Sequence, residues 1–201
     1  MGYEELDYAK VISFILTKAQ TSSNGIEGID LNGITIKEHL LNTAKAAYLE
    51  NINPIVMICQ QILETSIYAF KYNGTDESGN TKVIQSVVVP GDNNYAGLGA
   101  TSRGDEKNGF PSNEIGQLAQ AQHLKAYGSE EPLNSEMVDI RFEYVKRGSA
   151  TTVDKLSETW ASNPNYGVSI ARIYTELMNH QTNVGLVKEY ANFIFSGAES
   201  K

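Results

Sequence analysis

Two short segments of this sequence carry residues that could act together on a sugar. Leu63-Glu64-Thr65-Ser66 places a glutamate at the end of an apolar segment, and further along the chain 93–101 reads Asn-Asn-Tyr-Ala-Gly-Leu-Gly-Ala-Thr, a glycine-rich turn with an aromatic ring. Hydrolysis of a glycosidic bond needs an acid that protonates the bridging oxygen and a surface that holds the sugar beside it. The pairing of Glu64 with this loop therefore favours a glycosidase.

Glu64 differs from an ordinary surface glutamate in the helix that is predicted to carry it. The segment from Pro54 to about Ile67 is apolar nearly all round, which is typical of a helix at the centre of a fold. Burial there would raise the pKa of the carboxyl, and the negative end of the helix dipole would raise it further. A carboxyl group that keeps its proton near neutral pH can serve as a general acid.

The loop and the later aromatic residues each allow two interpretations. Asn94, Tyr95 and Gly97 suit a substrate-binding loop, although Asn-Asn-Tyr and paired glycines are also ordinary turn chemistry. Trp160 and Tyr166 could stack on a sugar or belong to the core. We expect Tyr95 and Tyr166 to line a glycan cleft, and Asn94 either to bind an acetamido group or to hold the loop.

The elements that must position these residues are predicted to be mostly helical. Helical patterns cover about 4–19, 35–48, 54–67, 112–127, 153–160, 167–178 and 183–195. The second of these begins with a Thr-x-x-Glu capping box, and the third begins with Asn53 and Pro54. These are strong signals for the start of a helix.

Strand signals are confined to two short stretches. Asn-Gly pairs at 24–25 and 32–33 mark turns and allow a small hairpin between them. Residues 81–89 are rich in β-branched side chains and predict a hairpin within about 70–90. The predicted class is α+β, predominantly helical, with residues 1–201 in one domain.

Composition and charge exclude several functional classes. A net charge of −8 without clusters of Lys or Arg argues against nucleic acid. No apolar run reaches the roughly 18 residues of a membrane span, so no membrane insertion is expected. The single cysteine, Cys59, excludes an intrachain disulfide, and its apolar helical setting favours a buried hydrophobic side chain.

The sequence predicts neither a metal nor a cofactor. His39, His123 and His180 are far apart in the sequence and lack the partners of a zinc motif. The nucleotide-binding glycine patterns and the serine-hydrolase motif are also missing.

The order of five motifs carries a family resemblance. The motifs are Leu63-Glu64-Thr65, the loop 93–101, Gln122-His123-Leu124-Lys125-Ala126-Tyr127, Lys146-Arg147-Gly148-Ser149-Ala150, and 160–167. Over about residues 40–178 the chain thus resembles the glucosaminidase domain of glycoside hydrolase family 73, which comprises bacterial autolysins and phage lysins. The resemblance implies a lysozyme-like fold with a small β-hairpin lobe beside a catalytic cleft. It also implies an endo-β-N-acetylglucosaminidase that cleaves the β-1,4 bond after N-acetylglucosamine in peptidoglycan.

The resemblance also assigns roles to individual residues. It implies that Glu64 is the catalytic glutamate, that 94–97 is the family's Asn-Phe/Tyr-Ala-Gly loop, and that Tyr166 is its late tyrosine. The chain departs from the pattern at Ser66, where the family has glycine, and at 72–89, which is longer than in related domains. Both departures lie beside the expected cleft, so they affect specificity rather than class.

Inverting hydrolysis needs a second carboxylate as a base, whereas substrate assistance uses the sugar's own acetamido group and needs none. The candidates downstream of Glu64 are Asp76, Glu77, Asp92, Asp105, Glu106 and Glu114. We expect Asp92 to act as an auxiliary catalytic group because it directly precedes the loop. Substrate assistance is favoured over a dedicated base.

Two other functions stay open on the sequence. A lysozyme-type muramidase or lytic transglycosylase would share the fold and the lone glutamate but cut the other bond, and a non-catalytic glycan-binding or phage tail module belongs to a different class. In each case the expected partner is the glycan strand of peptidoglycan. The expected location is extracellular or in the cell wall, although the N-terminus lacks signal-peptide features. Release by phage lysis, carriage on a virion or membership of a longer secreted protein would account for that.

Overall fold

The computed structural model describes residues 6–100, 102–103 and 109–198. Thr101 of the glycine-rich loop and the candidate acids Asp105 and Glu106 lie outside the described residues.

Helices make up most of the described chain. They are α1 (Tyr8–Thr21), α2 (Ile36–Leu49), α3 (Pro54–Glu64), α4 (Asn113–Gly128), α5 (Leu156–Thr159), α6 (Tyr166–Asn179) and α7 (Val184–Ala198). The strands β1 (Lys71–Thr75) and β2 (Thr81–Gln85) pair in an antiparallel, two-stranded sheet. The predicted class, α+β and predominantly helical, is confirmed.

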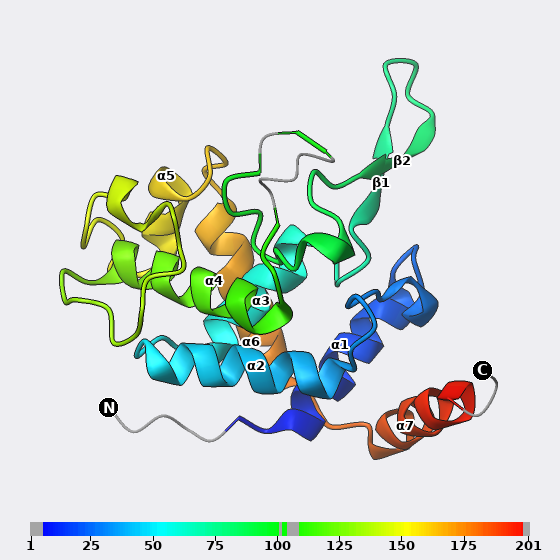
Figure 1. Ribbon diagram of the computed structural model, residues 1–201. Helices are drawn as coiled ribbons and strands as arrows, with labels where there is room; N and C mark the ends of the chain where they lie inside the picture. The colour runs from blue at the N-terminus through cyan, green and yellow to red at the C-terminus, as the bar shows by residue number, and fades with distance from the viewer. Residues whose placement is uncertain (1–5, 101, 104–108, 199–201) are drawn as a thin grey trace.

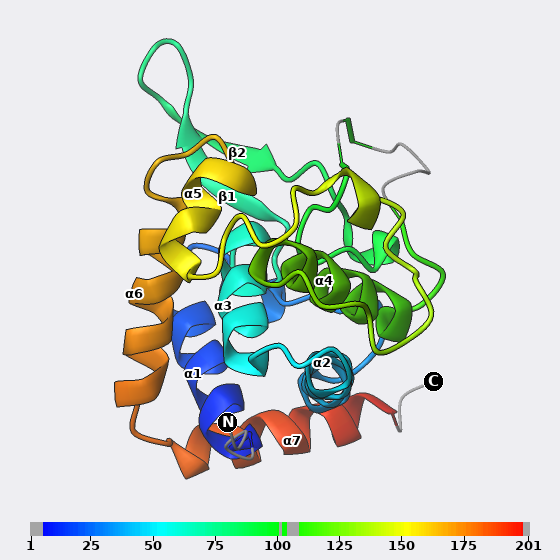
Figure 2. The same cartoon turned by 90° about the vertical axis from the view of Figure 1, so that its left-hand side faces the viewer.

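Helix α3 is the central element of the fold. Figures 1 and 2 show it in the middle of the molecule, with α2, α4 and α6 around it. Three consecutive side chains in its middle, Met57, Ile58 and Cys59, are fully buried. This position accounts for the nearly all-round apolar pattern of the segment, because a helix with packed neighbours on every side has little face left for solvent.

The predicted start signals of α2 and α3 are both present as hydrogen bonds. At α2, Thr35 Oγ1 accepts from Glu38 N at 3.1 Å, and Glu38 Oε2 accepts from Thr35 N at 2.9 Å. At α3, Asn53 Oδ1 accepts from Ile55 N at 2.8 Å, next to a proline at the first helical position. Each cap satisfies backbone N–H groups that have no partner within the helix.

The predicted hairpin within 70–90 is confirmed, with shorter strands than expected. Its register runs from Lys71 opposite Gln85 to Thr75 opposite Thr81, and it projects away from the helices at the top of Figures 1 and 2. The strand predicted to reach Val89 ends at Gln85. Ser86 N still donates to Phe70 O at 2.9 Å, but Phe70 has φ +53°, so the opposite chain is no longer extended there and the ladder stops.

Two other boundaries differ from the sequence prediction. The residues between the Asn-Gly pairs form a short 3-10 turn, Ile26–Gly28, and not a hairpin. The first helix begins at Tyr8, because Asp7 acts as its N-cap and accepts from Lys10 N at 3.0 Å.

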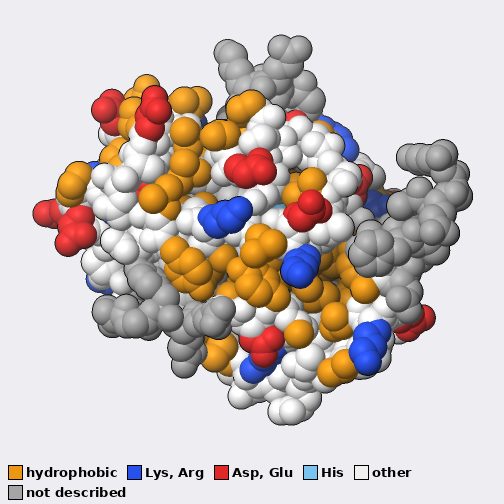
Figure 3. All heavy atoms as spheres, turned by 60° about the horizontal axis from the view of Figure 1, so that its bottom comes forward, with side chains coloured by type: hydrophobic (Ala, Val, Ile, Leu, Met, Phe, Trp, Pro, Cys, Tyr) orange, Lys and Arg blue, Asp and Glu red, His pale blue; other side chains and the backbone are white. Residues whose placement is uncertain are grey.

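No helix in the described ranges is long and apolar enough to cross a membrane. Figure 3 shows one face of the molecule, on which Lys and Arg side chains are scattered among acidic and hydrophobic ones. This face therefore carries no continuous basic surface of the kind that binds phosphate backbones.

Candidate active site

Glu64 is the last residue of α3, and its carboxyl group lies between two other parts of the chain. The Tyr166 hydroxyl, from the start of α6, donates to Glu64 Oε1. On the other side, a Cβ placed on Gly97 would lie 3.7 Å from Glu64 Oε2. The structure therefore brings together Glu64, Gly97 and Tyr166, three of the residues that the sequence predicted for the site.

Burial raises the pKa of Glu64 above its ordinary value, and it is the larger of two opposing effects. The smaller effect is the hydrogen bond from Tyr166, which stabilises the charged form and lowers the pKa. Glu64 is only partly buried, so its carboxyl group is not sealed inside the core. A partly accessible carboxyl with a raised pKa has the properties of a proton donor.

Tyr166 reaches the site with its hydroxyl, while its ring belongs to the core. The residue is 5% exposed, and its oxygen accepts from Gln60 Nε2 at 2.9 Å. Burial and the neighbouring Glu64 carboxylate raise the pKa of Tyr166 far above its ordinary value, so it stays a hydroxyl donor. The expectation that its ring lines a glycan cleft does not fit this burial.

The backbone directly after Glu64 is strained. Ser66, Ile67 and Tyr68 have φ of +52°, +63° and +60°, a left-handed turn that L-residues adopt at a cost of roughly 1–2 kcal/mol each. Tyr68 N donates to Thr65 Oγ1 at 2.7 Å and helps to hold the turn. The turn explains why α3 ends at Glu64 and not at Ile67, and it is the kind of strain that accumulates at functional sites.

The loop that faces Glu64 is held from within by Asn94. Its Nδ2 donates to Leu98 O and its Oδ1 accepts from Leu98 N, both at 2.9 Å, and the residue is 1% exposed. Of the two roles open for Asn94, the structure places it in the one that holds the loop. Gly97 has φ +66°, which only glycine adopts without strain.

Tyr95 lies in the core, not on the wall of a cleft. It is 2% exposed, and its ring centroid lies 4.4 Å from that of His39 and 5.8 Å from that of Phe70. Burial raises the pKa of Tyr95 to about 12. The expectation that Tyr95 lines the cleft therefore does not fit, because the loop backbone turns this ring inward as an anchor.

Trp160 is the predicted aromatic residue that keeps a partly exposed surface. Its ring centroid lies 4.9 Å from that of His123 and 5.9 Å from that of Tyr127. It also packs against a small apolar cluster of Ala96 and Leu98 from the loop and Ala119 from α4, and His123 Nδ1 is bonded to Asp139 Oδ2 at 2.7 Å. Trp160 thus lies beside the loop that faces Glu64.

The candidate second carboxylates have other partners. Asp92 Oδ2 accepts from Val89 N at 2.8 Å and so stabilises the short turn that precedes the loop. Asp76 accepts from two backbone N–H groups at the hairpin tip, and Glu114 lies in the first turn of α4, where hydrogen bonds lower its pKa. Glu77 is exposed in the same hairpin turn as Asp76. Within the described ranges, no hydrogen bond or ion pair links any of these four to Glu64.

Sequence reasoning missed a group of buried polar residues behind Glu64. They are His39, Gln60, Gln61, Gln117 and Gln120, each at most 2% exposed. A signal existed in α3, since Gln60-Gln61 is a polar pair in the middle of an otherwise apolar helix. A buried amide needs partners, so the pair indicated a polar network.

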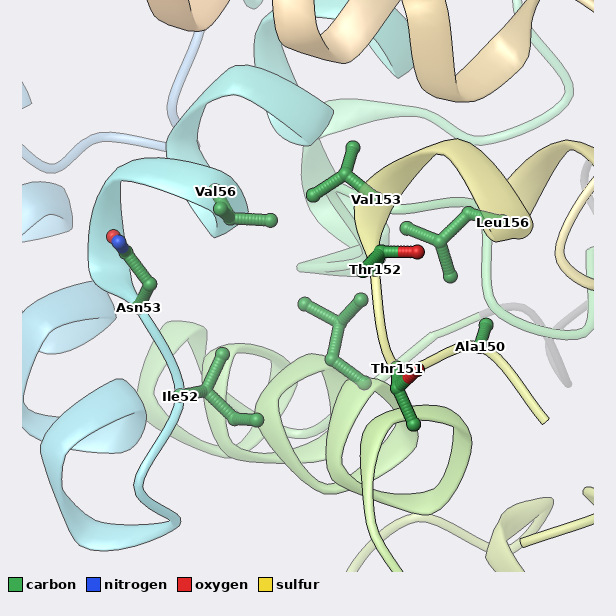
Figure 4. Close-up of a pocket in the computed structure, with 9 residues that line it drawn as sticks. Ile52, Asn53, Val56, Ala150, Thr151, Thr152, Val153 and Leu156 are labelled. Carbon is green, nitrogen blue, oxygen red and sulfur yellow. The ribbon is translucent and has the colours of Figure 1, made fainter. Parts of the chain in front are cut away.

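Three of the cavities in the described part of the chain lie away from Glu64. Figure 4 shows one of about 170 Å³ between the start of α3 and residues 150–156. It is lined by Ile52, Asn53, Val56, Leu124, Ala150, Thr151, Thr152, Val153 and Leu156, with no ionisable side chain among them. A second of about 440 Å³ lies against α7, and a third of about 310 Å³ lies against α6. Glu64 lines none of the three.

The described residues contain no group of three or more His, Cys, Asp or Glu side chains that could hold a metal ion. Cys59 is buried, and burial raises the pKa of its thiol to about 12. It is therefore a thiol at neutral pH and not a reactive thiolate.

Fold and site together define a helical α+β protein with a partly buried carboxyl at the end of its central helix. No protein-family model and no solved structure matches the chain. A relative from Borreliella burgdorferi, described as "Uncharacterized protein", is 30% identical over 182 residues, which covers 88% of this chain and 82% of that protein. The chain belongs to one family with this Borreliella protein.

Proposed function

We propose that the protein is a peptidoglycan hydrolase, an endo-β-N-acetylglucosaminidase that cleaves the β-1,4 bond after N-acetylglucosamine. The observation that carries the proposal is the arrangement of Glu64, with a raised pKa, one oxygen bonded by Tyr166 and the other facing Gly97. The order of motifs, similar to that of glycoside hydrolase family 73, supports the substrate class. The strained turn after Glu64 supports a functional role for this end of α3.

In the proposed reaction, Glu64 acts first as a general acid. Its proton passes to the bridging oxygen as the bond between that oxygen and the anomeric carbon breaks. The carbonyl oxygen of the sugar's own acetamido group then bonds to the anomeric carbon. Water attacks that carbon in the second step, the bond between the carbon and the acetamido oxygen breaks to restore the acetamido group, and the Glu64 carboxylate accepts the proton of the water. No second carboxylate is needed.

The other predicted residues support this reaction from around the acid. Asn94 and Tyr95 hold the loop that places Gly97 opposite Glu64, and Asp92 stabilises the turn before that loop. Asp92 thus acts as an auxiliary group through position. Trp160 offers its partly exposed ring to a sugar, which has an apolar face suited to an aromatic surface.

The proposed class has a lysozyme-like fold, and the protein would work outside the cytoplasm on the bacterial wall as a phage lysin or an autolysin module. The central helix that ends in an acid and the hairpin at one end of the molecule are compatible with such a fold. The Gly97 side of Glu64 is the side on which the proposal puts the glycan.

The test is the identity of the fragments released from purified peptidoglycan, determined by mass spectrometry. The proposal predicts fragments with N-acetylglucosamine at the reducing end. N-acetylmuramic acid or its anhydro form at that end would instead identify a muramidase or a lytic transglycosylase. Binding of peptidoglycan without any release of fragments would identify a non-catalytic module.

A further inference from the structure

Behind Glu64, a row of buried polar side chains connects four helices. It begins at His39 in α2, passes to Gln61 in α3, crosses to Gln120 in α4, returns to Gln60 in α3, and ends at Tyr166 in α6. Burying polar groups costs free energy unless each is paired, so these side chains can stay buried because they form hydrogen bonds with one another.

The hydrogen bonds of this row all point in one direction. His39 Nε2–H donates to Gln61 Oε1 at 2.9 Å, and Gln61 Nε2 donates to Gln120 Oε1 at 2.7 Å. Gln120 Nε2 then donates to Gln60 Oε1 at 2.8 Å. At every link a donor group meets an acceptor, and no link requires two donors or two acceptors to face each other.

The row reaches the carboxyl through Tyr166. Gln60 Nε2 donates to the Tyr166 hydroxyl oxygen at 2.9 Å, and that hydroxyl donates to Glu64 Oε1. At the far end, Asn113 Nδ2 lies 3.0 Å from His39 Nδ1. Since an amide N–H can only donate, His39 Nδ1 must accept, and the histidine proton lies on Nε2.

Two physical consequences follow for Glu64. Hydrogen bonds that run in one direction polarise one another, so each donor strengthens the next one along the row. Tyr166 donates to Oε1, and the carbonyl oxygen of a carboxylic acid is a better acceptor than its hydroxyl oxygen, so a proton carried by Glu64 is favoured on Oε2, which faces Gly97. The row therefore favours Oε2 as the oxygen that gives up a proton, on the side that faces Gly97.

We infer that this row, here called the donor chain (His39, Gln61, Gln120, Gln60 and Tyr166), fixes the orientation and protonation of Glu64. Its members in α2, α3 and α4 do not touch the substrate. They are positioning residues that act on Glu64 through Tyr166. The effect on the reaction rests on the proposed function, whereas the direction of the donor chain is independent of that function.

Helix α4 offers a matched pair of variants. Gln120 is a link of the donor chain, whereas Gln117, one turn earlier, is a side branch. Gln117 Oε1 accepts from Gln61 Nε2 at 2.6 Å and from Thr43 Oγ1 at 2.9 Å, but its own Nε2 has no partner in the described structure. Both are buried, at 2% and 0% exposure, so Gln120→Met and Gln117→Met make the same change with and without a break in the chain.

The first measurement is an NMR titration of the Glu64 carboxyl carbon, which needs no substrate. Tyr166 is the titratable side chain that acts on Glu64 in the described structure, and its donation lowers the Glu64 pKa. Gln120→Met should weaken that donation and raise the Glu64 pKa by about 0.5, while Gln117→Met should leave it as in the wild type. Equal values in the two variants would overturn the inference.

The second measurement is turnover of peptidoglycan. Gln120→Met should lower kcat by about tenfold with KM little changed, because a small misplacement of a catalytic group is enough for such a loss. Gln117→Met should stay within about twofold of the wild type. Equal losses in the two variants would reduce the donor chain to a structural network. If the wild type itself releases nothing, the proposed function fails, and the titration still decides whether the chain acts on Glu64.

A third measurement uses the unmodified protein and does not depend on variants that fold. The ¹⁵N chemical shifts of His39 should show a neutral ring with its proton on Nε2 down to about pH 4, the value to which burial lowers its pKa. A proton on Nδ1 would reverse the first link and contradict the inference.

Discussion

At the scale of single residues, Glu64 is subject to two opposing effects. Burial at the end of α3 favours the neutral carboxyl, and the hydroxyl of Tyr166 favours the carboxylate. Burial is the stronger, so the folded protein holds this proton more tightly than the unfolded chain does. The same difference links the chemistry of the residue to the stability of the fold.

We therefore expect Glu64→Gln to make the protein more stable than the wild type at neutral pH. Between the ordinary glutamate pKa and the raised one, the unfolded chain has lost the proton and the folded one has kept it, so wild-type stability falls as the pH rises. Below the ordinary value both states are protonated, and the advantage of the variant should disappear. Urea unfolding at several pH values measures this. The raised pKa would be contradicted if the stability of the variant minus that of the wild type were smaller at pH 7 than at pH 4.

The role of the Tyr166 hydroxyl can be separated from that of its ring. Tyr166→Phe keeps the buried ring and removes the donor, so the pKa of Glu64 should rise further. The alkaline limb of the activity profile, where the acid loses its proton, should move to higher pH as turnover falls. Tyr166→Ala is a poor test, because loss of this buried ring should cost about 3–5 kcal/mol of stability. An unchanged alkaline limb in Tyr166→Phe would show that the hydroxyl does not act on the acid.

At the scale of elements, the end of α3 and the loop 93–99 form the site. The left-handed turn at 66–68 fixes where α3 stops, and the contact of the loop with α4 fixes how near Gly97 comes to Glu64. The turn has positive φ at residues that carry a Cβ, and the loop passes so close to Gly116 of α4 that a Cβ there would not fit. Each therefore gives a single-residue test.

Ser66→Gly should stabilise the protein by about 1 kcal/mol, because glycine adopts φ +52° without the strain that serine has there. The midpoint of guanidinium unfolding measures the effect. Ser22 provides the control, since its φ is −84° and its hydroxyl donates to Ala19 O at 2.8 Å. Ser22→Gly should be destabilising. If Ser66→Gly also destabilises, the turn is not strained in the way described.

Gly116→Ala should destabilise the protein by about 2 kcal/mol or more and lower turnover. A Cβ at this position would lie 1.9 Å from Asn93 O, so the loop would have to move off α4. Gly185→Ala is the control, because its nearest contact would be 3.4 Å from Asn183 Oδ1. Since alanine favours helix over glycine by about 1 kcal/mol, destabilisation at Gly116 alone would mark the close approach. Equal effects at both positions would contradict it.

The elements themselves could largely be predicted from the sequence. The caps of α2 and α3 and the hairpin follow from local signals, such as Thr35 with Glu38 and the β-branched run after Thr81. The left-handed turn could not be predicted, because Ser66 and Ile67 are residue types that rarely adopt it. Its conformation is held by contacts with the rest of the fold.

The site was predictable in part. Glu64 and Tyr166 stood out by residue type and motif order, and the structure joins them by a hydrogen bond. The inward turn of Tyr95 was not predictable, because the backbone of the loop decides which side chain faces the core. The donor chain was not predictable either, since no local pattern reveals that polar residues of separate helices meet.

At the scale of the whole molecule, the protein is net acidic and mostly helical, with Glu64 at the end of a central helix, and we propose that it cuts the glycan of the bacterial wall. The similarity to the Borreliella protein extends over most of the chain. The proposal applies to that relative only if it has a glutamate at the position of Glu64. Every proposed role in the site, from the loop to the donor chain, depends on Glu64 as proton donor.

The most direct test compares the wild type with Glu64→Gln on purified peptidoglycan. We expect the wild type to release fragments with N-acetylglucosamine at the reducing end. We expect the folded variant to lose activity by about two orders of magnitude or more, because glutamine keeps the shape of the side chain but has no acidic proton. A folded wild type that releases nothing, or a variant that keeps more than about a tenth of the activity, would contradict the central claim.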